Sequence, residues 1–136
     1  MLSLLDALEE LFERHGYYGD RTMNLVMPGI DGLQKMKALM ARLRERPLSE
    51  IAGTKVLFAL DYSTGIKTEL GTGREETMEL SGSNVLRYEL EDHTSFIVRP
   101  SGTEPKIKVY LLTKAESAAE GQEKIRRYAA FAETLQ

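Results

Sequence analysis

Residues 86–111 read LRYELEDHTSFIVRPSGTEPKIKVYL, and this stretch contains three segments with the pattern of β-strands. Over 86–90, apolar and charged side chains alternate, as expected for a strand with one buried face and one solvated face. An acidic turn then leads into a second strand over 94–98, and a third alternating strand covers 106–111. Because short connections join these consecutive strands, the stretch predicts an antiparallel sheet.

Three segments outside this stretch have the spacing of amphipathic helices. Apolar residues recur three and four positions apart over residues 2–15, 33–46 and 117–135. The run Asp31-Gly32-Leu33-Gln34 resembles an N-cap followed by a capping-box glutamine, so it predicts the start of the second helix. Pro47 prevents that helix from continuing.

Short apolar runs predict two further strands, over residues 23–27 and 55–62, and Tyr17 to Asp20 read as a connection. Residues 63–83 are rich in Gly, Ser and Thr, which predicts a long loop or an excursion with weak structure. The order of these elements predicts an α+β fold in which helices pack on one face of an antiparallel sheet.

The composition excludes several classes of protein. The 136 residues are 42% hydrophobic and 29% charged, which is ordinary for a soluble globular chain and rules out wholesale disorder. The sequence contains no cysteine, so thiol catalysis, zinc–thiolate sites and disulfides are excluded. The net charge of −3 argues against a nucleic-acid partner.

No stretch approaches the ~18 apolar residues of a membrane span, so we expect no membrane partner. The short apolar run at the N-terminus lacks a basic region and is interrupted by acidic residues, unlike a secretion signal. We therefore expect a cytoplasmic location.

The connection between the last two strands, residues 99–106, has the chemistry of a phosphate-binding loop. Arg99 presents a planar fork of donors that matches two phosphate oxygens, and Ser101 and Thr103 supply hydroxyl donors. Gly102 lets the backbone approach a ligand closely and can help to form a concave nest of N–H groups.

The residues around the loop add stiffness and positive charge. Pro100 and Pro105 stiffen its two ends, which reduces the entropy lost when it orders around an anion. Lys106 and Lys108 lie two positions apart on a strand and so share a face. A tight turn held by bonds between hydroxyl side chains and the backbone, with its cations merely solvated, is the alternative interpretation.

The run from Arg99 to Lys106 resembles the signature loop of the α-D-phosphohexomutases, the phosphoglucomutase/phosphomannomutase family, and the likeness continues through Tyr110. That loop belongs to the fourth, C-terminal domain of those enzymes, which has a TATA-box-binding-protein-like fold. Residues 1–20 are similar to the helix and linker that end the third domain. The resemblance thus implies that residues 21–136 form the C-terminal phosphate-binding domain.

The resemblance also implies a reaction, the interconversion of hexose 1-phosphate and hexose 6-phosphate through a bisphosphorylated sugar. In the parent enzyme it implies Mg²⁺ and glucose 1,6-bisphosphate as cofactors. The fourth domain would hold the phosphate that is not reacting, and the other three domains would be its partners. The residues implied to bind the phosphate here are Arg99, Ser101, Gly102, Thr103 and Lys108, with Glu104 and Lys106 as accessory residues. Lys108 stands where the family commonly has Arg, and it lacks the bidentate fork.

The chain lacks the family's nucleophilic serine segment and its Asp-Gly-Asp-Gly-Asp metal loop. We therefore expect no catalytic residue, metal site or cofactor in this chain, and no activity from it alone. A free-standing module that binds phosphosugars or other anions without catalysis is the alternative function.

Overall fold

The computed structural model describes residues 18–27, 29–79, 82–101, 104–115 and 117–135. These residues form eight strands and two helices: one strand precedes the first helix, and the other seven strands follow one another between the two helices. The strands are β1 (Tyr18–Val26), β2 (Glu50–Ile51), β3 (Thr54–Asp61), β4 (Ile66–Glu69), β5 (Arg74–Thr77), β6 (Leu86–Leu90), β7 (Thr94–Pro100) and β8 (Lys106–Lys114). The helices are α2 (Gly32–Glu45) and α3 (Ala118–Glu133).

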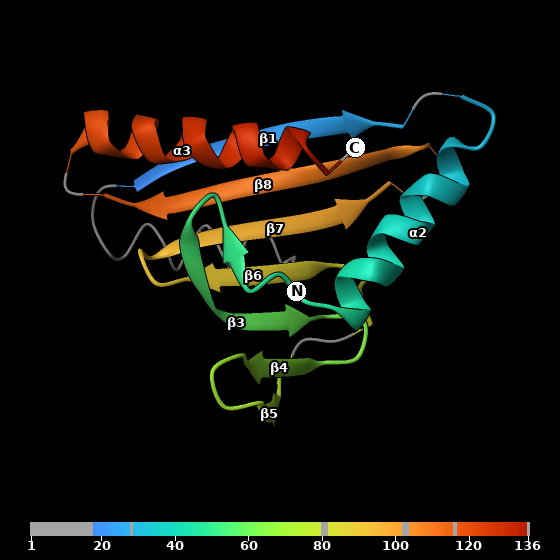
Figure 1. Ribbon diagram of the computed structural model, residues 1–136, viewed down its shortest axis with the longest axis horizontal. Helices are drawn as coiled ribbons and strands as arrows, with labels where there is room; N and C mark the ends of the chain where they lie inside the picture. Colours follow the sequence, from blue (N-terminus) through green and yellow to red (C-terminus); the bar gives the residue numbers. More distant parts are fainter. Residues whose placement is uncertain (1–17, 28, 80–81, 102–103, 116, 136) are drawn as a thin grey trace.

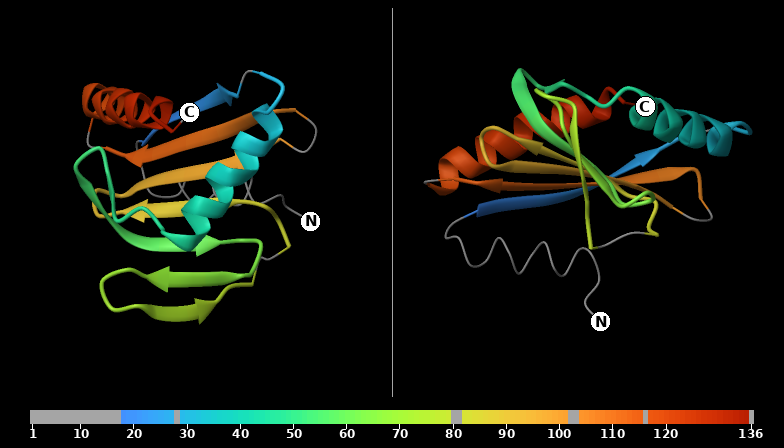
Figure 2. Two further views of the ribbon diagram at one scale, coloured as in Figure 1. Left: turned by 45° about the vertical axis from the view of Figure 1, so that its right-hand side comes forward. Right: turned by 90° about the horizontal axis from the view of Figure 1, so that it is seen from below.

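The strands pair antiparallel throughout, in the order β1-β8-β7-β6-β3-β4-β5, and β2 pairs with β3 off this path. The two helices lie on the same side of the sheet (Figure 2). Figure 1 shows α3 running along β1 and β8, while α2 crosses the sheet diagonally. This arrangement confirms the predicted fold class, an antiparallel sheet with helices on one face.

The main core fills the space between the sheet and the helices, because strand residues of one parity point toward them. Its fully buried members include Tyr88, Phe96 and Val109 from the sheet and Tyr128 from α3. A second, smaller cluster of buried apolar residues lies on the opposite face of the sheet. It consists of Leu60, Tyr62, Val85, Ile97 and Leu112.

The structure corrects the prediction for residues 63–83, which contain the two strands β4 and β5. Their side chains are half-buried or exposed and mostly polar, so the sequence shows no apolar alternation. The two strands form a hairpin, and β4 pairs with β3, so backbone hydrogen bonding extends the sheet here without a buried side-chain pattern.

In the first part of the chain, one local prediction is wrong, and the predicted start of the second helix is confirmed without its capping hydrogen bond. Residues 18–20 are not a connection, because β1 begins at Tyr18 and pairs with the end of β8 from its first residue. Asp31 occupies the N-cap of α2, but its side chain makes no capping hydrogen bond and instead lies 3.6 Å from Lys35 Nζ. The interaction of a carboxylate with a lysine one turn ahead competes here with the cap.

The predicted helix over 2–15 lies outside the described residues, and the division at residue 20 stays a prediction. In the described part of the chain, neither helix combines the length and the apolar character that a membrane crossing needs.

Candidate functional site

The predicted phosphate loop connects β7 to β8 at one end of the sheet, on the right in Figure 1. Hydrogen bonds within the loop stabilise its conformation. The Ser101 N–H donates to the Lys106 carbonyl at 2.8 Å, and the Lys106 N–H donates to the Glu104 carbonyl at 2.7 Å. The Glu104 N–H donates to Ser101 Oγ at 3.3 Å, which leaves the Ser101 hydroxyl hydrogen able to donate elsewhere. Gly102 and Thr103, two of the expected phosphate ligands, lie outside the described residues.

The structure brings Arg99 and Lys108 together, because they are register partners on β7 and β8. Their neighbours Val98 and Val109 are completely buried under the helices, so Arg99 and Lys108 project from the opposite face of the sheet, where both are exposed. Lys106 lies on this face as well, as its spacing from Lys108 predicts, and its Nζ lies 3.6 Å from the Glu104 carboxylate. Three cations therefore gather at one end of the face opposite α2 and α3.

Ser101 is placed differently from these cations. With Pro100, it lines a groove of about 540 Å³ that continues along α2 past Met40 to Arg44 and Asn84. A cavity of this volume falls in the ~300–1,000 Å³ range of small-molecule sites. The loop thus has cations on the face of the sheet opposite α2 and α3, and a groove on the side of α2.

The connection from β1 to α2 supports the second half of the loop. The Met27 N–H donates to the Pro105 carbonyl at 2.7 Å. Gly32, the first residue of α2, packs so closely that a Cβ atom there would lie 2.8 Å from Pro105 Cβ and 2.1 Å from the Met27 carbonyl oxygen. Sequence reasoning assigned Gly32 only to a helix start, because the contact with Pro105 joins segments far apart in the chain.

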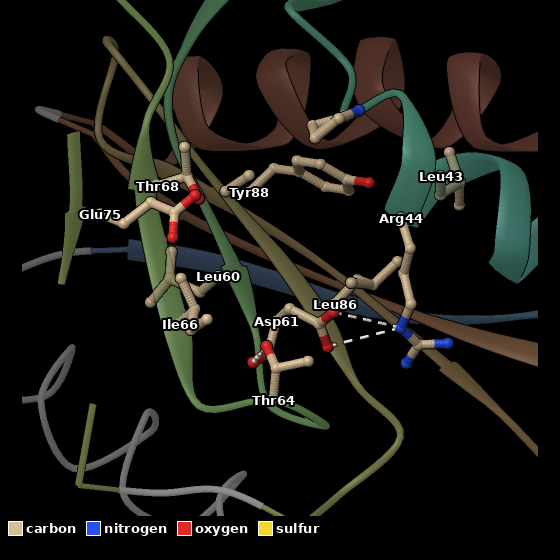
Figure 3. Close-up of a pocket in the computed structure, with 12 residues that line it drawn as sticks. Leu43, Arg44, Leu60, Asp61, Thr64, Ile66, Thr68, Glu75, Leu86 and Tyr88 are labelled. Carbon is tan, nitrogen blue, oxygen red and sulfur yellow. Dashed lines mark hydrogen bonds and ion pairs between the residues drawn. The ribbon is translucent and has the colours of Figure 1, made fainter. Parts of the chain in front are cut away.

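A second cavity, of about 140 Å³, lies between the end of α2 and strands β3, β4 and β6 (Figure 3). Arg44 reaches across its rim to Asp61, with Nε 3.3 Å from Oδ2 and 3.4 Å from Oδ1, and also donates to the Asn84 side chain. Burial, reinforced by the Asp61 carboxylate, raises the pKa of the Tyr88 phenol, which lines this cavity. Since Asp61 compensates the Arg44 charge, this cavity is a poorer site for an anion than the end of the sheet that carries Arg99 and Lys108.

Within the described ranges, the His, Asp and Glu side chains form no group of three that could hold a metal ion. The described part of the site therefore offers hydrogen-bond donors and positive charge, which is the chemistry of anion binding.

Comparison with known proteins shows the family of the chain. The family model "Phosphoglucomutase/phosphomannomutase, C-terminal domain" matches residues 30–130, which include α2, the loop and most of α3. The chain belongs to this family.

Curated relatives of this phosphoglucomutase/phosphomannomutase C-terminal domain are named phosphoglucomutase. The protein of Staphylococcus haemolyticus is 37% identical over 127 residues, which cover 93% of this chain and 23% of the relative. That of Staphylococcus saprophyticus is 34% identical over 120 residues, covering 88% of this chain and 21% of the relative. That of Staphylococcus aureus is 35% identical over 123 residues, covering 90% of this chain and 22% of the relative. The chain thus spans about a fifth of the length of these relatives, as one domain of a larger protein does.

Proposed function

We propose that this chain is the substrate-phosphate-binding domain of a phosphohexomutase, an enzyme that interconverts hexose 1-phosphate and hexose 6-phosphate through a bisphosphorylated sugar. The observation that carries the proposal is the pairing of Arg99 with Lys108 on one exposed face beside the 101–105 loop. The relatives named phosphoglucomutase favour glucose phosphates as substrates.

The two cations have complementary chemistry toward a phosphate dianion. The guanidinium of Arg99 can donate two parallel hydrogen bonds to two phosphate oxygens, and Lys108 adds a compact charge with rotatable donors. Lys106 is less available, because the nearby Glu104 carboxylate shares its charge. We therefore assign Arg99 and Lys108 as principal phosphate ligands and Lys106 and Glu104 as accessory residues.

The internal hydrogen bonds of the loop, from Ser101 to Lys106, favour binding because a loop that is already ordered loses less entropy when it closes on an anion. In this proposal the Ser101 hydroxyl donates to the phosphate, and Gly102 and Thr103 complete the ligand set.

A domain of this kind contributes to catalysis by binding the phosphate that does not react. That binding energy holds the sugar in place while its other end undergoes phosphoryl transfer. Because the bisphosphorylated intermediate presents a phosphate at both ends, a loop that recognises phosphate accepts the sugar in either orientation. The nucleophilic serine and the Mg²⁺ site then belong to the other domains of the parent enzyme, which we place in the cytoplasm.

The test is a titration of the isotopically labelled chain with glucose 1-phosphate, followed by amide NMR. We expect the signals of Ser101, Glu104 and Lys108 to shift. Arg99→Ala should weaken binding about tenfold, since hydrogen bonds to charged groups contribute ~1.5–3 kcal/mol. Lys106→Ala should have a smaller effect.

Lys114→Ala is the matched control. Lys114 lies on the same strand and the same face as Lys108, at the far end of β8, so its removal lowers the net charge without touching the loop. Wild-type affinity in Arg99→Ala, or an equal loss in Lys114→Ala, would contradict the proposed site.

A further inference from the structure

A polar residue from the edge strand extends the row formed by Arg99 and Lys108. Asn24 of β1 is the register partner of Lys108 on β8, just as Lys108 is the partner of Arg99 on β7. Met23 and Leu25, on either side of Asn24, are buried toward the helices. Asn24 therefore lies on the same face as the two cations, opposite α2 and α3, and it is exposed.

The spacing of this row suits a phosphorylated sugar. Neighbouring strands lie about 4.8 Å apart, so the three residues span about 10 Å from Arg99 to Asn24, with Lys108 between them. A phosphate bound between Arg99 and Lys108 would carry its sugar ring either away from the sheet or along this row. Along the row, the first polar side chain beyond Lys108 is that of Asn24.

The chemistry of Asn24 differs from that of its two neighbours in the row. Arg and Lys only donate hydrogen bonds, whereas a carboxamide both donates and accepts, as a sugar hydroxyl does. Among the described residues, no hydrogen bond to the Asn24 side chain is formed, so the carboxamide is available to a ligand.

We propose that Asn24 hydrogen-bonds a hydroxyl group of the hexose whose phosphate is held by Arg99 and Lys108. This inference rests on the proposed function and adds to it a contact that distinguishes a phosphosugar from phosphate alone. Asn24 is then a binding residue contributed by β1, more than seventy positions before the loop.

The experiment compares two ligands, glucose 1-phosphate and inorganic phosphate, with the full chain and its Asn24→Ala variant, again by amide NMR titration. Asn24→Ala should weaken binding of glucose 1-phosphate about fivefold, the effect of one neutral hydrogen bond. Its affinity for inorganic phosphate should stay that of the wild type.

Thr22→Ala is the control, because Thr22 is exposed on the same face of β1, one row away, opposite Tyr110. It should bind both ligands like the wild type. The assignment of Asn24 would be overturned if Asn24→Ala bound glucose 1-phosphate as tightly as Thr22→Ala does. It would also be overturned if Asn24→Ala lost the same affinity for inorganic phosphate as for glucose 1-phosphate.

Arg99→Ala separates failure of this inference from failure of the proposed function. If Arg99→Ala loses binding of both ligands while Asn24→Ala has no effect, the proposed phosphate site stands and only the proposed sugar contact is wrong. Unchanged binding in Arg99→Ala, or no binding of either ligand by the wild type, would overturn the phosphate site and the Asn24 contact together.

Discussion

Gly32 supports the proposed phosphate-binding loop, because its missing side chain leaves space for Pro105. Pro105 and the Met27 carbonyl both occupy positions that any Cβ atom at residue 32 would contact too closely. The Met27 N–H adds a hydrogen bond to Pro105 from the same connection. The close packing of a helix start against the loop thus helps to determine where the second half of the loop lies.

We expect Gly32→Ala to destabilise the protein by about 1–3 kcal/mol, the usual range for overpacking, and to weaken glucose 1-phosphate binding because Pro105 must move. Urea unfolding and NMR titration measure the two effects. Gly71→Ala is the control, since a Cβ at Gly71 meets no atom within 4 Å. If Gly32→Ala matched Gly71→Ala in both measurements, Gly32 would have no role in placing the loop.

At the scale of secondary-structure elements, α3 is attached to the sheet by a buried polar cluster around Tyr128. This side chain is 0% exposed, and its hydroxyl donates to the Asp92 carboxylate in the β6–β7 turn and accepts from the Thr54 hydroxyl of β3, with the two oxygens 2.8 Å apart. Lys124, one turn earlier on α3, donates to the Asp92 and Lys114 carbonyls at 3.2 Å and 3.0 Å. The cluster therefore ties α3 to the β6–β7 turn, to the start of β3 and to the end of β8.

This cluster predicts a loss of stability in alkali. Burial and then the Asp92 hydrogen bond raise the pKa of Tyr128, so folding favours its protonated phenol. The stabilisation is complete below the ordinary tyrosine pKa of ~10 and is lost as the pH rises above that value. In urea unfolding at increasing pH, the free energy of unfolding should fall more steeply in the wild type than in Tyr128→Phe.

Tyr128→Phe is expected to retain part of the alkaline slope, because burial raises the pKa of Tyr88 as well. Tyr88→Phe therefore serves as the companion variant, and the double variant should show the shallowest dependence. Identical slopes in wild type and all three variants would show that neither phenol is coupled to folding.

At the scale of the whole molecule, the sheet separates a buried polar cluster from the proposed binding site. The Asp92–Tyr128 cluster lies at one end of β7, and the phosphate loop with its cations lies at the other end (Figure 1). The residues proposed to contact the ligand come from β1, β7, β8 and the loop between β7 and β8. The three strands are adjacent in the sheet although β1 is remote in sequence.

The chain spans about a fifth of the length of its phosphoglucomutase relatives, which predicts binding without turnover. Supplied with Mg²⁺ and glucose 1,6-bisphosphate, the chain should bind glucose 1-phosphate and form no glucose 6-phosphate in a coupled assay. The full-length parent should convert it under the same conditions. Conversion by this chain alone would contradict the assignment of the chemistry to other domains, and an inactive parent would favour a binding module without catalysis.

The sequence by itself determined the elements whose side chains alternate or repeat. The alternation over residues 86–111 predicted three strands, the apolar spacing predicted α2 and α3, and the residue types of 99–106 predicted an anion-binding loop. Each of these signals is local, since burial of one face of a strand or helix leaves its period in the neighbouring residues.

The tertiary structure alone decided the rest. It showed the β4–β5 hairpin, the contact of Gly32 with Pro105 and the alignment of Asn24 with Lys108. These features depend on backbone hydrogen bonds and on close packing between distant segments. Backbone hydrogen bonds are the same for every side chain, and register arises only when two strands meet, so neither leaves a period in the sequence.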